Sequence, residues 1–239
     1  MDNLVYWCLQ QAPQTSTAWE SLSPAEKTIY EGFRFEARRK SWLAGRFTAK
    51  HLVSKIYDAR YRPDQIEIRN NDLGAPCAYR ADQPLPGCLS ISHSGDWAAA
   101  AYAPKKLRIG IDLENITHRS DAFIQDYFTE HEVKMVSSAH TSSPTGTLRS
   151  AERATLIWSA KEALLKALGI GLRLDTRRVE VIAIGDEEGE EPVGWKRLGL
   201  SSNQVSSPID AYWRRIGRYV VTLVVLMESH KNMKLVEVT

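Results

Sequence analysis

The segment WSAKEALLKALG, Trp158 to Gly169, constrains the fold most, because it is apolar on nearly every side of the helix that it predicts. The helical pattern runs from about Ala151 to Leu168, and Gly169 is a residue that typically ends a helix. A helix with apolar residues around most of its circumference belongs in a protein interior. Its apolar residues are Leu156, Ile157, Trp158, Ala160, Ala163, Leu164, Leu165, Ala167 and Leu168.

Three charged residues interrupt this helix: Lys161, Glu162 and Lys166. Glu162 and Lys166 are four residues apart, so their side chains share one helix face. One interpretation is an ordinary surface salt bridge, which contributes little stability. The other follows from burial, because a charged pair on a buried helix needs a partner or a water-filled cleft. The spacing alone favours the surface salt bridge, and the burial of the helix favours the partner or cleft.

Other segments predict strands and helices joined by short turns. Ser23, Pro24 and Glu26 form the signature of a capping box at a helix start. Helical spacing resumes across residues 38–57. The remaining predictions are a strand at 4–9, a strand and turn at 66–79, a helix at Phe123–Val136, a strand at Val179–Ile184 and a hairpin at 211–227.

The middle of the chain predicts three consecutive strands, Leu89–Ser92, Trp97–Tyr102 and Arg108–Glu114, separated by the turns SGD and APKKL. We expect them to pair as a β-meander. Because short turns favour antiparallel pairing, the predicted class is α+β. Ser137 to Thr147, rich in Ser and Thr, is expected to be a flexible loop, and no internal sequence repeat is visible.

The net charge of the chain is small, but its basic residues are concentrated in one segment. The 239 residues suit one large domain or two small ones, and the net charge of +2 excludes no partner class by itself. The segment Glu31–Arg62 is locally basic, which favours an anionic ligand or an acidic partner surface. Its basic residues are Arg34, Arg38, Arg39, Lys40, Arg46, Lys50, Lys55, Arg60 and Arg62.

The cysteines and the apolar runs indicate the cellular compartment in which the protein is expected. Cys8, Cys77 and Cys88 are odd in number and form no CxxC pair, so we expect neither a disulfide framework nor a zinc site. The first ten residues lack the basic region of a signal peptide. The longest apolar run, Tyr219–Met227, is too short to span a bilayer. We therefore expect a soluble, cytoplasmic protein with no membrane contact.

Two short motifs could carry chemistry. In RIGIDLEN, strand alternation places Ile109, Ile111 and Leu113 on one face and the carboxylates of Asp112 and Glu114 on the other. Two carboxylates backed by an apolar face form a plausible half-site for Mg²⁺, although a solvated acidic strand face is the alternative.

The second motif is ISHSG, at the turn that follows the first of the three strands. His93 at a strand end could donate a hydrogen bond to a phosphate, with Ser92 and Ser94 beside it. A lone histidine at a turn is more often a side chain that only contacts solvent.

Together these motifs resemble the 4′-phosphopantetheinyl transferases, in their longer, pseudo-dimeric Sfp-type branch. The family signatures (V/I)G(I/V)D(V/I)E and W(S/T/A)xKE(A/S)xxKxxG are matched by IGIDLE, Ile109–Glu114, and by Trp158–Gly169. The family's SHS segment is matched by Ser92–Ser94, and its AGR element by Ala44–Arg46. The resemblance runs from about Leu22 to about Leu174.

The resemblance implies an enzyme that transfers the 4′-phosphopantetheine arm of coenzyme A to a serine of an apo carrier protein and releases adenosine 3′,5′-bisphosphate. It implies Mg²⁺, with Mn²⁺ as a substitute, held by Asp112, Glu114 and Glu162. Asp112, Glu162 and Lys166 would be the catalytic residues, with Glu162 helping to deprotonate the serine and Lys166 near the pyrophosphate. Lys161 would have only a secondary role.

The same resemblance implies a coenzyme A site formed by Arg46, Arg39, Ser92, His93 and Lys166. One departure concerns this site. Many family members carry Gly-Lys-Pro before the SHS segment, where the lysine binds the nucleotide end, whereas this chain has Gly74-Ala75-Pro76. Arg80 or a residue of the basic helix would have to replace that lysine.

The resemblance also implies an organisation and a set of partners. We expect a monomer of two similar α+β halves related by pseudo-two-fold symmetry, residues 1–116 and 117–239, each a small antiparallel sheet packed with helices and with the active site between them. The partners would be carrier proteins or domains of fatty-acid, polyketide or nonribosomal-peptide synthases, and no nucleic acid.

Three alternatives remain open at this point. A Mg²⁺-dependent phosphohydrolase could use the same carboxylates, but hydrolysis does not require the full WSAKEALLKALG spacing. A nucleic-acid binder could use the basic helix, but it leaves Asp112, Glu114 and Glu162 without a role. A family member that binds coenzyme A without transferring its arm is the third, and Ala75 keeps it open.

Overall fold

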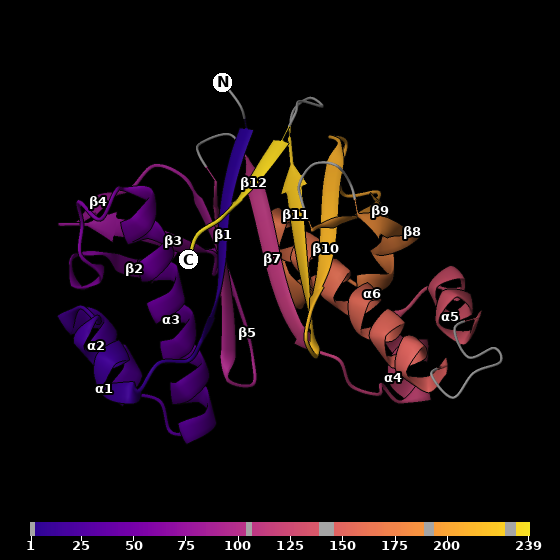
Figure 1. Cartoon of the computed structure of the whole chain (residues 1–239), viewed down its shortest axis with the longest axis horizontal. Helices are drawn as coiled ribbons and strands as arrows, with labels where there is room; N and C mark the ends of the chain where they lie inside the picture. The colour runs from indigo at the N-terminus through magenta and orange to yellow at the C-terminus, as the bar shows by residue number, and fades with distance from the viewer. Residues whose placement is uncertain (1–2, 104–106, 139–145, 189–193, 228–232) are drawn as a thin grey trace.

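The structure is a computed structural model that describes residues 3–103, 107–138, 146–188, 194–227 and 233–239. It has two groups of helices on the outside and two β-sheets packed between them (Figure 1). The first sheet has the strand order β12-β1-β6-β5, the second has the order β7-β11-β10-β9-β8, and a small third sheet contains β2-β3-β4. The α+β class is therefore confirmed.

The elements follow one another in an alternating order. The helices are α1 (Thr15–Glu20), α2 (Pro24–Glu31), α3 (Glu36–Ile56), α4 (Asp121–Tyr127), α5 (Glu130–Ser137) and α6 (Gly146–Leu168). The strands are β1 (Asn3–Gln11), β2 (Glu67–Asn70), β3 (Pro76–Arg80), β4 (Gln83–Pro84), β5 (Cys88–Ser94), β6 (Trp97–Ala103), β7 (Arg108–Asn115), β8 (Val179–Glu188), β9 (Lys196–Ser202), β10 (Ile209–Ile216), β11 (Tyr219–Leu226) and β12 (Met233–Glu237).

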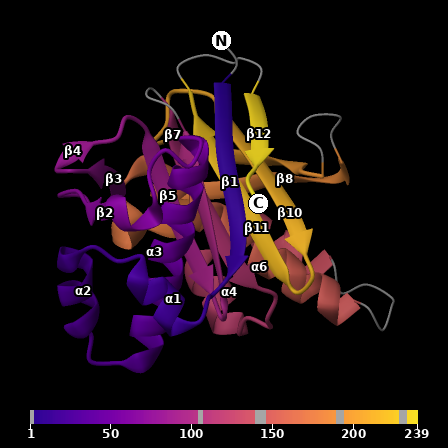
Figure 2. The ribbon, with the colours of Figure 1, turned by 60° about the vertical axis from the view of Figure 1, so that its left-hand side comes forward.

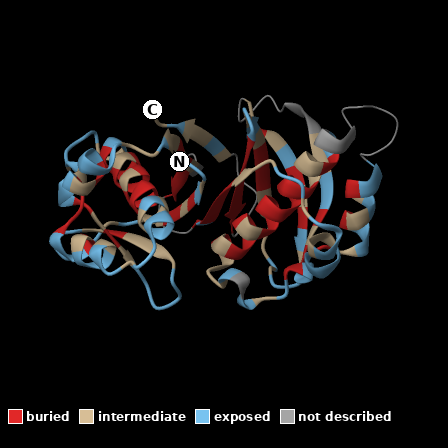
Figure 3. Ribbon diagram, turned by 90° about the horizontal axis from the view of Figure 1, so that it is seen from below, coloured by how far each residue is buried: buried red, intermediate tan, exposed pale blue. Residues whose placement is uncertain are grey.

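Three apolar layers hold these elements together, and Figure 3 shows the buried residues gathered in the sheets and in the faces of α3 and α6 turned toward them. The central layer lies between the two sheets and includes Trp7 of β1, Ile111 of β7 and Leu223 of β11. The outer layers lie between α3 and the first sheet and between α6 and the second. All eight residues of β11 are buried, because it has apolar layers on both faces.

The helix predictions are largely confirmed. α6 is buried along most of its length and ends where Gly169 takes a positive φ of 71°. The capping box at α2 forms as predicted, with the Ser23 side chain accepting from the backbone of Glu26 and the Glu26 side chain accepting from the backbone of Ser23. Within the described residues, no helix is both long and apolar enough to cross a membrane.

The predicted β-meander is wrong in its third strand. β5 and β6 pair as expected, but β7 pairs antiparallel with β11, with Asp112 opposite Thr222. β7 is buried on both faces, with Ile111 in the central layer and Gly110 against α6. β7 pairs with β11, which is more than 100 residues away and buried on both faces, rather than with the neighbouring strand β6. The length of the turn between β6 and β7 does not indicate such a distant pairing.

The single helix predicted at Phe123–Val136 is also wrong, because the chain forms α4 and α5 with a break between them. Phe128 is extended, with φ −107° and ψ 153°, and Thr129 then caps α5. Thr129 and Glu132 form a second capping box, which favours a new helix start at this point. The loop predicted at Ser137–Thr147 lies mostly outside the described residues.

A buried ion pair organises the first group of helices. Lys50 of α3 pairs with Glu26, and both side chains are fully buried. Glu26 also accepts from the backbone N–H of Ile68 in β2, and Lys50 donates to the carbonyl of Ser21, two residues before the N-cap of α2.

The second group of helices contains the same arrangement. Lys161 of α6 pairs with Glu132, the capping-box residue of α5. Glu132 accepts from the N–H of Val181 in β8, and Lys161 donates to the carbonyl of Tyr127, two residues before the N-cap Thr129. The halves thus share both an element order and a buried network, which is compatible with the predicted pseudo-two-fold relation.

The division at Ile116 stays a prediction. The two segments that it separates exchange strands: β7, from the first, belongs to the second sheet, and β12, from the second, lies parallel beside β1 (Figure 2).

Candidate active site

The candidate site begins at a network between β5, β7 and α6. The Nζ atom of Lys166 lies 2.7 Å from Oδ1 of Asp112 and donates to Oγ of Ser92 at 3.0 Å. Ser92 donates to the same Asp112 oxygen at 2.8 Å. Asp112 is 2% exposed and Lys166 is partly exposed, so the network reaches from the interior to solvent.

Serine side chains of β5 hydrogen-bond to the backbone of β7 and hold the two strands side by side. Ser90 and Ser94 accept hydrogen bonds from the backbone N–H groups of Ile111 and Asn115 in β7. Because side chains alternate along a strand, Ser90, Ser92 and Ser94 all face β7, and His93 points the other way. β5 therefore links the network on one face to a pocket on the other.

Two carboxyl groups of the site, those of Glu114 and Glu162, have raised pKa values. Burial and the nearby Asp112 raise the pKa of Glu162 to about 7, although Lys166 opposes the shift. Burial and Asp112 also raise the pKa of Glu114, which pairs with Arg119 at 2.9 Å. The negative charges of neighbouring carboxylates repel one another and disfavour ionisation. A cation bound between them would offset this repulsion.

The residues fit a magnesium ion shared with a phosphate ligand. Oδ2 of Asp112 is buried and has no hydrogen-bond partner within the described residues. Across the same residues, no three histidine, cysteine or carboxylate side chains already form a closed group able to hold a metal. Mg²⁺ commonly binds one or two carboxylates and completes its shell with water and substrate phosphates, so it needs no closed group.

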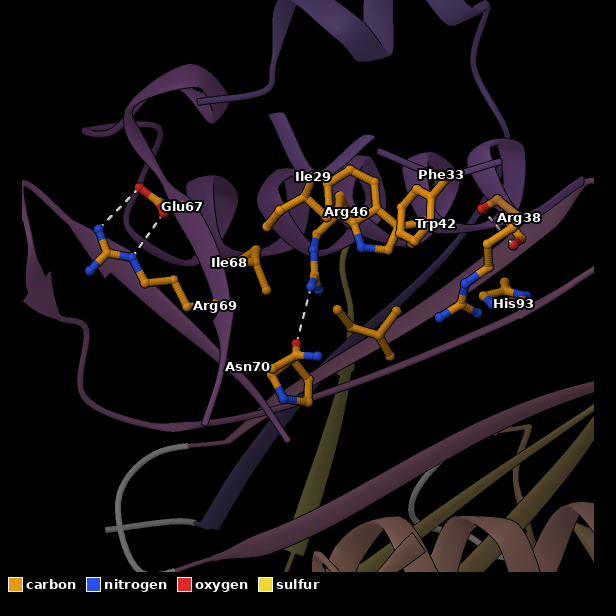
Figure 4. Close-up of a pocket in the computed structure, with 14 residues that line it drawn as sticks. Ile29, Phe33, Arg38, Trp42, Arg46, Glu67, Ile68, Arg69, Asn70 and His93 are labelled. Atoms are coloured by element: carbon orange, nitrogen blue, oxygen red, sulfur yellow. Dashed lines mark hydrogen bonds and ion pairs between the residues drawn. The ribbon is translucent and has the colours of Figure 1, made fainter. Parts of the chain in front are cut away.

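A pocket of about 590 Å³ lies on the other face of β5, between α3 and the small sheet (Figure 4). Arg38 and His93 lie together at one end, and Arg46 donates to Asn70 in the middle at 3.1 Å. The guanidinium of Arg46 lies over the ring of Trp42, 5.0 Å from its centroid. Partial desolvation, with Lys166 and Arg38 nearby, lowers the pKa of His93. The pocket combines fixed positive charge with an aromatic wall.

The structure brings together most of the residues singled out in the sequence. Asp112, Ser92 and Lys166 share one network, Glu114 and Glu162 interact electrostatically with Asp112, and Arg46 and His93 line the pocket. Arg39 does not line it, because its guanidinium donates to the carbonyls of Phe33 and Glu31. Arg80 lies over the ring of Tyr61.

Three residues of the site were not among the site residues predicted from the sequence. Arg38 and Trp42 line the pocket, and the i, i+4, i+8 spacing of Arg38, Trp42 and Arg46 could have revealed their common helix face. Arg119, which pairs with Glu114, carried no sequence signal.

Gly110 sets how closely the two signature segments approach. A Cβ atom built on Gly110 would lie 1.8 Å from the carbonyl oxygen of Ala163 and 2.7 Å from the N atom of Ala167. Only a residue without a side chain lets α6 lie this close to β7. This contact brings Glu162 and Lys166 to the strand that carries Asp112.

Comparison with known proteins agrees with this geometry. Residues 108–224 match the model of the 4′-phosphopantetheinyl transferase superfamily. A holo-[acyl-carrier-protein] synthase of Lactococcus lactis is 34% identical over 114 residues, which are 44% of this chain and 94% of that protein. The chain therefore belongs to the 4′-phosphopantetheinyl transferase superfamily.

Longer relatives match more of the chain. A phosphopantetheinyl transferase of Thraustochytrium is 30% identical over 178 residues, 70% of this chain and 59% of that protein. The mouse L-aminoadipate-semialdehyde dehydrogenase-phosphopantetheinyl transferase is 28% identical over 172 residues, 68% of this chain and 53% of that protein. The chain thus spans between half and three fifths of the length of these relatives.

Proposed function

We propose that this chain is a 4′-phosphopantetheinyl transferase, which moves the phosphopantetheine arm of coenzyme A to a serine of an apo carrier protein. The observation that carries the proposal is the position of β5, with the Lys166–Asp112 network on one face and the basic aromatic pocket on the other. Coenzyme A has its nucleotide phosphates at one end and its reacting pyrophosphate next to them, so it needs adjacent sites of these two kinds.

In this proposal the pocket binds the nucleotide end. Arg38, Arg46 and His93 donate to phosphate oxygens, and Trp42 supports the Arg46 guanidinium. Two arginines of the basic helix thereby supply the charge that Ala75 does not. The neutral form of His93 can still donate one hydrogen bond to phosphate.

The transfer itself needs a base, a cation and a fixed geometry. Glu162 takes the proton of the carrier serine, whose oxygen forms a bond to the phosphorus of the 4′-phosphate. The bond between that phosphorus and the bridging oxygen breaks, and adenosine 3′,5′-bisphosphate leaves. Lys166 stabilises negative charge on the leaving side. Mg²⁺ held by Asp112, Glu114 and Glu162 would offset the charge of the pyrophosphate.

The direct test is the intact mass of an apo carrier protein after incubation with the chain, coenzyme A and Mg²⁺. We expect a gain of one phosphopantetheine arm that a chelator abolishes. Asp112→Ala and Glu162→Ala should abolish it as well, and Glu20→Ala, which removes an exposed carboxylate, should not.

Two other outcomes would overturn the proposal. A folded Asp112→Ala or Glu162→Ala variant that keeps the wild-type rate would show that these carboxylates do not carry the reaction. Cleavage of coenzyme A without any carrier would show a phosphohydrolase instead.

A further inference from the structure

A second basic cavity lies in the other half of the molecule, away from the candidate active site. It has a volume of about 390 Å³, and Arg149, Arg153, Lys196 and Trp213 are among the residues that line it. A neighbouring cavity of about 440 Å³ shares Lys196 and Trp213 and adds Arg214 and Arg215.

The second cavity is the counterpart of the pocket proposed to bind the nucleotide end. The buried lysines Lys50 and Lys161 occupy equivalent places in α3 and α6, because each pairs with the glutamate of an equivalent capping box. The residues 12, 9, 8 and 5 positions before each lysine line the two cavities. These are Arg38, Ser41, Trp42 and Gly45 in α3, and Arg149, Glu152, Arg153 and Leu156 in α6.

The charge of the second cavity is not balanced within the described residues. Its single lining carboxylate, Glu152, pairs with Arg215 at 2.8 Å. Arg153 donates only to the Met135 carbonyl and to Ser138, and Lys196 lies over the ring of Trp213 at 5.2 Å. Arg149, Arg153 and Lys196 therefore form no ion pair with any side chain that the structure describes; the side chains of 186–188, including Glu188 opposite Lys196 in the β8–β9 pairing, lie outside that set.

The second cavity lacks the groups needed for group transfer. At the candidate active site, the strand that carries Asp112 and Glu114 is β7. Arg214, which lines the neighbouring cavity, lies over the ring of Trp7 in β1, so the strand beside the second cavity is β1 instead. β1 carries no carboxylate between Leu4 and Gln11, and the α3 residue equivalent to Glu162 is His51. Glu152, the carboxylate that lines this place, is held by Arg215, so among the described residues no free carboxylate remains to hold a metal or accept a proton. This place can therefore bind a ligand but has no means to transfer its phosphoryl group.

We propose that the second cavity is a binding site for a phosphate-bearing small molecule, separate from the candidate active site. Guanidinium groups match phosphate oxygens in shape and donate several hydrogen bonds at once, and Arg149 and Arg153 are four residues apart on one helix face. The volume is in the range of small-molecule sites, which favours a compact ligand over a protein surface.

The test is a two-dimensional NMR titration with inorganic pyrophosphate that follows the indole N–H signals of the tryptophans. Trp213→Phe and Trp42→Phe assign the signals of the two cavities. We expect the Trp213 signal to shift in the wild-type chain, and its Kd to weaken at least about tenfold in Arg149→Ala/Lys196→Ala. The Trp42 signal should titrate unchanged in that variant, and Arg60→Ala, an exposed arginine outside both cavities, should change neither.

Three results would overturn this proposal. The Trp213 signal could stay still at concentrations that saturate the Trp42 signal, or it could titrate equally in Arg149→Ala/Lys196→Ala. Binding that appears only after Glu190→Gln/Glu191→Gln would mean that carboxylates of the chain itself neutralise the cavity. Because the readout is binding of pyrophosphate at Trp213, it does not depend on whether the chain transfers phosphopantetheine.

Discussion

The Nζ atom of Lys161 lies 2.7 Å from a carboxylate oxygen of Glu132, and neither side chain is exposed to solvent. Lys161 also donates to the backbone carbonyls of Tyr127, Thr176 and Val179, so its ammonium group is fully occupied inside the second half. Lys166, five residues later in the same signature, faces Asp112 instead. The two lysines of one motif thus have different tasks, one in the fold and one in the site.

Replacing Lys161 should therefore affect stability and leave catalysis unchanged. Lys161→Met leaves the carboxylate of Glu132 buried without its counter-charge, and we expect the free energy of unfolding to fall by about 3–5 kcal/mol. Urea denaturation measures the loss, and the transfer rate at low temperature should stay near that of the wild type. A variant as stable as the wild type would contradict the structural role.

Replacing Lys166 should have the opposite effect. Lys166→Met removes the cation next to Asp112, and we expect kcat to fall by about 10²–10³-fold with a small change in stability. Lys55→Met is the matched control, because Lys55 stands five residues after Lys50 as Lys166 stands five after Lys161. Steady-state kinetics on an apo carrier measure kcat for both variants. Equal kcat values would show that Lys166 does not contribute to catalysis.

The raised pKa of Glu162 predicts a pH-dependent stability. Its folded-state pKa of about 7 lies above the ordinary 4.5, so its contribution to stability is complete below pH 4.5 and is lost as the pH rises through 7. In metal-free buffer with chelator, Glu162→Gln should match the wild type in thermal stability at pH 4.5 and exceed it at pH 8. The exposed Glu20→Gln should show no such trend, and a Glu162→Gln variant less stable at pH 8 would refute the assignment.

Gly110 predicts a steric test of the contact between the two signatures. Gly110→Ala places a Cβ atom within 1.8 Å of the Ala163 carbonyl, so α6 must move away from β7. We expect a loss of more than about 3 kcal/mol of stability and a loss of transfer. At Gly32, a Cβ atom would lie 3.4 Å from the nearest atom, so Gly32→Ala should change stability by less than about 1 kcal/mol.

The exposed basic residues around α3 predict how a carrier docks. Arg34 and Lys40 are exposed, whereas Arg46 and Lys50 are buried. If the exposed residues attract an acidic carrier surface, the KM for the carrier should rise with salt while the KM for coenzyme A changes less. Arg34→Ala/Lys40→Ala should weaken this salt dependence, and a KM for the carrier that is flat from low to high salt would rule out electrostatic docking.

Much of the local structure could be predicted from the sequence because it depends on neighbouring residues. The capping box of Ser23 and Glu26, the buried helix that ends at Gly169 and the alternation along β7 all follow from spacings of two to four residues. The same spacings place Glu162 beside Lys166 and Asp112 beside Glu114. The break between α4 and α5 was missed because the Thr129 capping box interrupts a run that is otherwise compatible with one helix.

The sequence by itself determined most of the helices and strands and the residue types of the candidate site, because these depend on local propensity and on short periodic patterns. Only the tertiary structure decided that β7 pairs with β11, that β5 joins the Lys166–Asp112 network to the pocket, and that Lys161 serves the fold. These outcomes depend on contacts between residues far apart in the chain, more than 100 positions for β7 and β11, and such contacts form where apolar surfaces are buried best. The repeat of the buried lysine network is of the same kind, since its two copies share contacts and little sequence.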